Sequence, residues 1–226
     1  MLNLPNALTC ANLLSGCIGI VFCFNGDLKS AAYFVILSGI FDFFDGMVAR
    51  ALKIKNGIGK DLDSLADMVS FGFLPGAVMF HLFKASNSPN EYLPYLAFLI
   101  TIFSALRLAK FNNDERQTVD FIGLNTPMNT LLIVSLPYVA DYHPEVIGNW
   151  IVLAAISVVC SYLLISEIKI FSLKFSNLKW SENKVKFVFM ILSLGLFVWQ
   201  QFVAIPIILL LYIGLSFVYF RQKKRL

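Results

Sequence analysis

Residues 30–51 read SAAYFVILSGIFDFFDGMVARA, and this stretch decides the fold class of the chain. It is long and apolar enough to cross the hydrocarbon core of a bilayer as a helix, which takes roughly 20 residues. A helix fits better than a strand because the apolar residues run on without alternating with polar ones. Asp42, Asp45 and Arg50 are its only charged residues. The stretch therefore predicts a transmembrane helix that carries carboxylates.

The rest of the chain repeats this pattern. Eight apolar segments come close to the length of a membrane span: residues 7–24, 30–51, 62–83, 92–109, 126–140, 149–166, 185–200 and 202–220. The whole chain is 58% hydrophobic and 14% charged, with a mean hydropathy of +0.74. A soluble domain carries about 25% charged residues. We therefore expect an all-α, polytopic membrane helix bundle of about eight transmembrane helices, one domain over residues 1–226, surrounded by membrane lipids and without a nucleic-acid partner.

The basic residues predict the orientation of these spans. With eight spans, sixteen of the 18 Lys and Arg residues fall in one set of loops, and only Lys29 and Lys84 in the other. Positive residues mark the cytoplasmic side, so both termini are predicted to be cytoplasmic and the protein to lie in the cell (inner) membrane. Residues 167–186 mix lysines with Phe171, Phe175 and Trp180. An interfacial segment and an ordinary cytoplasmic loop or helix extension both fit that mixture.

Four carboxylates lie inside predicted spans: Asp42 and Asp45 in the second, and Asp63 and Asp67 in the third. A charge at bilayer depth costs at least ~2.5 kcal/mol, so the group asks for a compensating ligand. Spacings of three and four residues place each pair on one helix face. The short loop over residues 52–60 would make the two helices antiparallel neighbours. We therefore expect the four carboxylates to converge in a polar cleft just below the cytoplasmic face.

The side chains at this cleft indicate which ligand it binds. Four carboxylates offer only oxygen, which favours Mg²⁺, with Mn²⁺ or Ca²⁺ as substitutes. Two ions suit four carboxylates better than one, and paired metals are a device for phosphoryl transfer. Gly46, Ala49 and Gly59 leave room for a ligand, and Arg50 can bind phosphate through two hydrogen bonds. The residues alone also leave open interhelical ion pairs, a structural scaffold, a proton relay and a divalent-cation or proton transporter.

Residues 42–67 follow the pattern D-x2-D-G-x2-A-R-x8-G-x3-D-x3-D. All eight specified positions match the signature of the CDP-alcohol phosphotransferase family, which this chain resembles. The resemblance implies an enzyme that moves a phosphoalcohol from a CDP-activated donor to an acceptor alcohol and releases CMP. It implies that Asp42, Asp45 and Asp63 hold metal ions and that Asp67 contacts metal and acts as general base. It also places four residues in the CDP pocket: Gly46, Ala49, Arg50 and Gly59.

Three further stretches resemble bacterial and archaeal type II phosphatidylserine synthases: residues 63–72 (DSLADMVSFG), 105–112 (ALRLAKFN) and 121–127 (FIGLNTP). In the third, Asn125 stands where these proteins usually have Pro. This resemblance implies CDP-diacylglycerol and L-serine as substrates. Arg107, at the predicted cytoplasmic end of its helix, would bind the serine carboxylate, and Asn112 would support it. Positive-inside anchoring is the alternative role for Arg107.

The start of the chain, residues 4–12 (LPNALTCAN), also resembles the opening of these proteins. It places Asn6 and Thr9 in the CDP-diacylglycerol pocket, although helix capping is an alternative role for both. Glycerol 3-phosphate or inositol in place of L-serine would keep the same chemistry. Because the family is commonly dimeric, the resemblance implies a homodimer.

Overall fold

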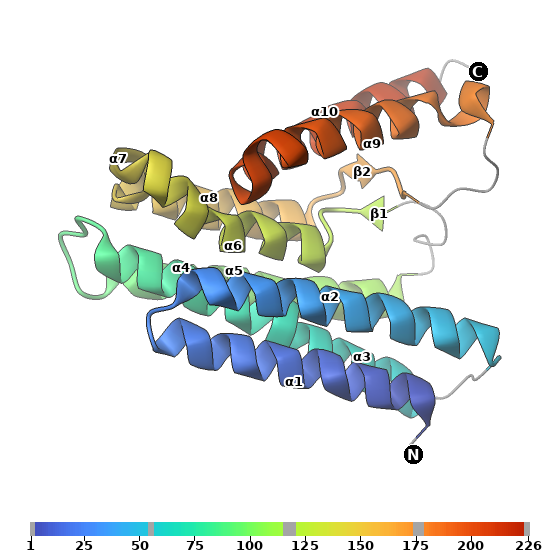
Figure 1. Ribbon diagram of the computed structural model, residues 1–226, viewed down its shortest axis with the longest axis horizontal. Coiled ribbons are helices and arrows are strands. Elements are labelled where there is room, and N and C mark those ends of the chain that lie inside the picture. The colour runs from blue at the N-terminus through green and yellow to red at the C-terminus, as the bar shows by residue number, and fades with distance from the viewer. Residues whose placement is uncertain (1–2, 54–56, 115–120, 174–178, 224–226) are drawn as a thin grey trace.

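The computed structural model describes residues 3–53, 57–114, 121–173 and 179–223. Within these ranges the chain is an all-α bundle, as the apolar segments predict (Figure 1). Each of the eight expected segments overlaps a helix. The helices are α1 (Leu4–Phe24), α2 (Leu28–Ala51), α3 (Gly57–Asp67), α4 (Leu74–Ala85), α5 (Phe98–Asn113), α6 (Thr126–Tyr142), α7 (Pro144–Ile147), α8 (Trp150–Ile165), α9 (Trp180–Gln200) and α10 (Ile205–Lys223).

Three short helices of other types join these elements. A π-helix (Met68–Phe73) links α3 to α4, so that one continuous helical stretch runs from Gly57 to Ala85. Two 3₁₀ helices, Leu93–Ala97 and Gln201–Ala204, precede α5 and α10. Gln201 has a positive φ of 49° and ends α9 at Gln200.

Membrane insertion follows from the length and composition of these helices. In the described part of the chain, five helical segments are long and apolar enough to cross a membrane: residues 4–24, 28–51, 57–85, 93–113 and 183–221. The last of these contains both α9 and α10, and α8 is apolar but only 16 residues long. The protein is therefore an integral membrane helix bundle. Eight crossings and cytoplasmic termini stay predictions.

The first two helices form a tight hairpin. Gly26, with φ of 83°, makes the turn, and the Asp27 carboxylate caps α2 by accepting a hydrogen bond from the Ser30 N–H at 3.0 Å. That hydrogen bonding holds the pKa of Asp27 below its usual value. At the other end of α1, the side chain of Asn3 accepts from the Asn6 N–H at 2.9 Å. Both helix starts thus satisfy backbone donors that would otherwise lack a partner.

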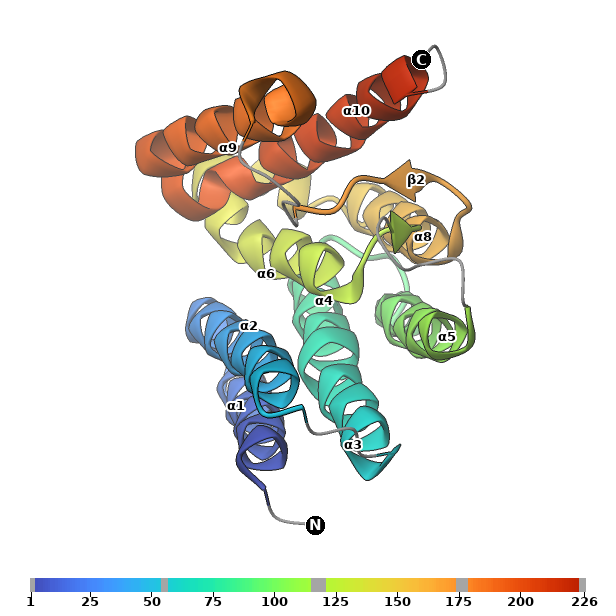
Figure 2. The same cartoon turned by 90° about the vertical axis from the view of Figure 1, so that its right-hand side faces the viewer.

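Helix α3 packs mainly against α1 and lies across from α2, rather than directly on it (Figure 2). The predicted loop over residues 52–60 does make α2 and α3 antiparallel, and residues 54–56 of that loop lie outside the described ranges. The expectation of directly neighbouring helices was therefore wrong, because α1 joins the two. This arrangement leaves space between the acid-bearing helices.

Part of the segment between α8 and α9 packs into the protein core. Its short strand β2 (Lys169–Ile170) pairs antiparallel with β1 (Phe121–Ile122), which lies between α5 and α6. Phe171 is fully buried against Phe189 and Tyr212 in a core formed with α9 and α10. Trp180 is exposed and begins α9, so the helix extends upstream of the predicted start. Phe175, the third aromatic residue of that prediction, lies outside the described ranges.

Candidate active site

Three carboxylates from two helices converge beside α1. Asp42 comes from α2, and Asp63 and Asp67 come from α3. One oxygen of each lies within 4.8 Å of one oxygen of each of the others. The spacing of four residues between Asp63 and Asp67 gives both the same helix face, and the antiparallel course of α2 brings Asp42 to it. The predicted convergence is thus found for three of the four aspartates.

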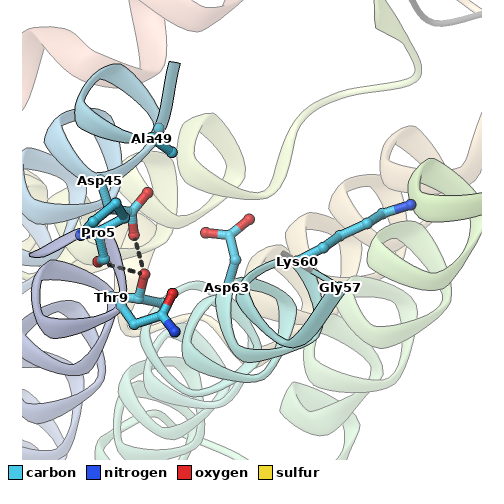
Figure 3. A pocket seen from close by; sticks show the side chains of 10 residues that line it. Pro5, Thr9, Asp45, Ala49, Gly57, Lys60 and Asp63 are labelled. Atoms are coloured by element: carbon cyan, nitrogen blue, oxygen red, sulfur yellow. Dashed lines mark hydrogen bonds between the residues drawn. The ribbon is translucent and has the colours of Figure 1, made fainter. Parts of the chain in front are cut away.

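Asp45, the fourth aspartate, has a different environment. It is buried, and its Oδ2 accepts a hydrogen bond from the Thr9 hydroxyl of α1 at 2.6 Å. It is not part of the three-carboxylate group formed by the described residues. Figure 3 shows Asp45 and Asp63 on opposite sides of a pocket, with Thr9 beside Asp45. The four aspartates therefore belong to one site, but only Asp42, Asp63 and Asp67 form the close cluster.

The three converging carboxylates fit a divalent metal ion. Their donors are all oxygen, the ligand type that Mg²⁺, Mn²⁺ and Ca²⁺ prefer. Three anionic groups this close repel one another unless protons or a cation compensate them. The Lys60 side chain points away from Asp63 (Figure 3), and its ammonium donates to the backbone oxygen of Asn112 at 2.7 Å, so it forms no ion pair with these carboxylates in the described part of the chain. The cluster can therefore hold a metal ion.

A pocket of about 520 Å³ opens next to this cluster (Figure 3). It gathers most residues predicted for the CDP-diacylglycerol pocket: Asn6, Thr9, Gly46, Ala49 and Gly59, together with Asp45 and Asp63. Pro5, Gly57 and Lys60 also line it and were missed. Their only sequence signal is position, since each lies within two residues of a predicted pocket residue.

Two glycines make room at this pocket. A Cβ on Gly59 would lie 3.2 Å from the Asn6 Oδ1, so the glycine lets the start of α1 approach α3. A Cβ on Gly46 would lie 3.4 Å from the Arg50 Nη1. The Arg50 guanidinium thus folds back over Gly46, beside the pocket lining. This is the position from which a guanidinium can reach a bound phosphate.

Arg107 and Asn112, predicted for the serine site, do not line this pocket. Arg107 is only 3% exposed, and its Nε donates to the Leu124 carbonyl at 3.3 Å while its guanidinium lies 5.1 Å from the Phe111 ring centre. The Asn112 amide donates to the Ser64 hydroxyl at 2.7 Å, one residue after Asp63. Arg107 thus ties α5 to the loop before α6, and Asn112 ties α5 to α3.

Asn125 shows how the chain accommodates its departure from the usual Pro. Its side chain accepts a hydrogen bond from the Met128 N–H at 2.9 Å and caps α6. Thr126 and Pro127 then begin the helix, and Pro is favoured in the first turn because it needs no donor there. The loop that carries Leu124 toward Arg107 therefore ends in a well-formed helix start.

An integral membrane helix bundle whose acidic cluster can hold a metal ion beside a pocket has the features of a membrane-bound enzyme. Comparison with known families makes this assignment specific. The family model described as CDP-alcohol phosphatidyltransferase matches residues 2–163. The chain belongs to this family and is a membrane transferase of phospholipid biosynthesis.

Individual relatives agree with the family. The chain is 32% identical over 170 residues to the CDP-diacylglycerol–serine O-phosphatidyltransferase of Bacillus subtilis (strain 168), covering 74% of this chain and 88% of the relative. It is 32% identical over 169 residues to the archaetidylserine synthase of Methanothermobacter thermautotrophicus, covering 74% of this chain and 68% of that relative. It is 28% identical over 193 residues to the CDP-diacylglycerol–serine O-phosphatidyltransferase of Helicobacter pylori (strain 26695), covering 84% and 80%.

Proposed function

We propose that this protein transfers the phosphatidyl group from CDP-diacylglycerol to L-serine, giving phosphatidylserine and CMP. The names of the relatives support serine as the acceptor, since those from Bacillus subtilis and Helicobacter pylori are serine phosphatidyltransferases. The observation that carries the chemistry is the convergence of Asp42, Asp63 and Asp67 at the edge of the pocket. Such a group fits one or two Mg²⁺ or Mn²⁺ ions.

The aspartates have distinct roles in this proposal. Asp42, Asp63 and Asp67 hold divalent ions, and Asp45 completes the site from the other side of the pocket. Bound divalent ions would neutralise the charge of the diphosphate and of the leaving CMP. Asp67 takes the proton from the serine hydroxyl as general base. The serine oxygen then bonds to the β-phosphorus, and the bond from that phosphorus to the bridging oxygen breaks, so CMP leaves with the electron pair.

The pocket and the apolar groove beside it match the two parts of the donor, CDP-diacylglycerol. The cytidine and diphosphate occupy the 520 Å³ pocket, where Gly46, Ala49 and Gly59 offer no bulk and Arg50 binds phosphate. An entirely apolar groove of about 290 Å³ runs along α2 past Phe43 and Phe44, next to the acids. An acyl chain fits this groove, so the donor enters laterally from the bilayer.

The serine site is the least complete part of the proposal. Arg107 and Asn112 both lie on α5 outside the donor pocket, Arg107 against Leu124 before α6 and Asn112 against Ser64 of α3. Serine would reach the cluster from the α5 side, opposite the donor. Arg107 then offers the guanidinium for the serine carboxylate, and Asn112 fixes Ser64 beside Asp63. We further propose a homodimer in the inner membrane with this site on the cytoplasmic side.

The first experiment is an acceptor panel. Purified protein is given CDP-diacylglycerol and Mg²⁺ or Mn²⁺, with L-serine, glycerol 3-phosphate or inositol in turn, and CMP release is measured. We expect release with L-serine and none when the metal is omitted and chelator is added. Faster release with glycerol 3-phosphate or inositol would refute serine as the acceptor and keep the chemistry. No release with any alcohol would refute the transferase proposal.

A further inference from the structure

Asn12 lies where α1 meets the two acid-bearing helices, α2 and α3. It is on α1, one turn after Thr9, and it is fully buried. Its side-chain Nδ2 donates a hydrogen bond to the Asp67 Oδ1 at 3.1 Å. Asn12 is outside the 42–67 signature and outside the donor pocket lining. Its contact with the proposed general base therefore calls for a separate explanation.

The backbone of Asn12 is held on two sides. Its carbonyl oxygen accepts hydrogen bonds from the Ser38 hydroxyl of α2 and from the Ser70 hydroxyl of the π-helix, both at 3.1 Å. Gly16, one turn further along α1, allows the close approach. A Cβ there would lie 2.3 Å from the Ser70 Oγ and 2.9 Å from its Cα. Asn12 is thus fixed relative to both α2 and the segment that follows Asp67.

The chemistry of the pair defines what Asn12 contributes. An ionised carboxylate only accepts hydrogen bonds, so the amide must present its NH₂ group to Asp67. The other amide atom, Oδ1, has no hydrogen-bond partner among the described residues. A neutral donor orients Asp67 without cancelling its charge, whereas a lysine would compete with a metal ion for the same carboxylate. Thr9 makes the corresponding contact with Asp45 one turn earlier.

We propose that Asn12 is a positioning residue for Asp67. It occupies one carboxylate oxygen and leaves the other for the divalent ion and for the proton of the acceptor alcohol. The inference rests on the proposed function, because it assigns Asn12 a role in that same site. It explains why a buried amide faces an acidic cluster inside the membrane.

The test replaces Asn12 by a residue of similar shape without a donor. Asn12→Leu should lower kcat at least tenfold and leave the KM for CDP-diacylglycerol within twofold, because the donor pocket is unchanged. Without substrates, Mn²⁺ binding measured by electron paramagnetic resonance should weaken at least fivefold. Asn12→Ala, if Asn12→Leu does not fold, should give the same two effects.

Ser15→Ala is the matched control, because it removes a buried hydroxyl on the same helix, which bonds to the Ala11 carbonyl, and keeps every hydrogen bond of Asn12. It should leave kcat and Mn²⁺ affinity within twofold of the unmodified protein. The proposal is overturned if the Asn12 variants keep either quantity, or if Ser15→Ala lowers both to the same extent. An unmodified protein that releases no CMP would refute the proposed function instead, and the Mn²⁺ measurement would still test the link between Asn12 and Asp67.

Discussion

The four aspartates of the site differ in their neighbours, although the sequence pattern treats them alike. Asp42 and Asp63 face each other within the three-carboxylate group, Asp45 accepts from Thr9, and Asp67 accepts from Asn12. Both donors are neutral and both come from α1. Hydrogen bonds to a buried carboxylate lower the cost of keeping it charged. At the scale of single residues, α1 therefore donates a hydrogen bond to each of two aspartates, Asp45 and Asp67. Because both donors are neutral, the negative charge of the site stays available to a cation.

The variant Asp67→Asn tests whether Asp67 is the general base. The amide keeps the shape of the side chain but cannot take the proton, so we expect turnover to fall by about 10²–10⁴-fold. CMP release with L-serine gives the measurement. Asp61→Asn is the matched control, since it makes the same change on an exposed position of α3 and should leave turnover unchanged. Near-normal activity of Asp67→Asn would rule out Asp67 as the base.

At the scale of elements, α1 determines the geometry of the site. Helices α2 and α3 both pack on it, and the pocket opens where they face each other. Small residues permit this packing: Gly16 meets the π-helix at Ser70, and Gly19 meets Leu74 of α4. Interfaces between membrane helices favour such residues because they let backbones come close. The π-helix directly follows Asp67. Short π-helical turns are frequent at functional sites, so its place here fits the proposed site.

Gly16→Ala tests this packing. The added methyl group would overlap Ser70, including its Cα, so backbone must move. We expect a loss of stability of about 1–3 kcal/mol, typical of overpacking, and reduced CMP release. Gly214→Ala in α10 is the control, because a Cβ there meets nothing within 4 Å. Thermal unfolding in one detergent compares the two, and equal midpoints would contradict the role given to Gly16.

The cap of α2 predicts a dependence of stability on pH. Hydrogen bonds from Ser30 lower the folded-state pKa of Asp27, so its contribution is present above the unfolded pKa of about 3.9 and is lost as pH falls through the lower folded value. Asp27→Ala should therefore unfold at a lower temperature than the unmodified protein at pH 7, and the difference should narrow below pH 3.9. Asp27→Asn keeps an acceptor and should reduce the loss at pH 7. A difference that does not change with pH would contradict the assignment.

At the scale of the molecule, the two ends of the bundle differ in charge and in function. Arg50 and Lys53 lie at the C-terminal end of α2 and Lys60 in the first turn of α3, the helix ends that border the pocket. Lys29 and Lys84 lie at the other end, where Lys29 pairs with Asp141. Positive residues favour the cytoplasmic side, so this distribution agrees with a site that faces the cytoplasm. Lys55, Arg116, Lys174, Lys224 and Arg225, which contributed to the prediction, lie outside the described ranges.

Cysteine labelling tests this orientation. In a variant without the four native cysteines, Asn90→Cys and Lys53→Cys each place one exposed thiol at opposite ends of the bundle. A membrane-impermeant maleimide should label Asn90→Cys in intact cells. It should label Lys53→Cys only after the membrane is permeabilised. The reverse pattern would place the active site outside the cytoplasm.

The amino-acid sequence alone determined the all-α membrane fold, the positions of the helices and the residues of the acidic signature. These properties depend on the length of apolar runs and on spacings within a single helix, which are local. The caps that Asp27 and Asn125 form also depend on local spacing, although neither was predicted. The spacings of Asp45 after Asp42 and of Asp67 after Asp63 were readable from the sequence for the same reason.

Only the tertiary structure decided which of these residues meet. It separated Asp45 from the other three acids and brought the Asn12 amide to Asp67. It also buried Phe171 in the core formed with α9 and α10, and it tied Arg107 to Leu124. Each of these contacts joins residues on different elements, from 17 to 55 positions apart in the hydrogen-bonded pairs. They depend on how closely the helices and loops approach one another, and those distances result from side-chain packing over the whole bundle rather than from any one segment.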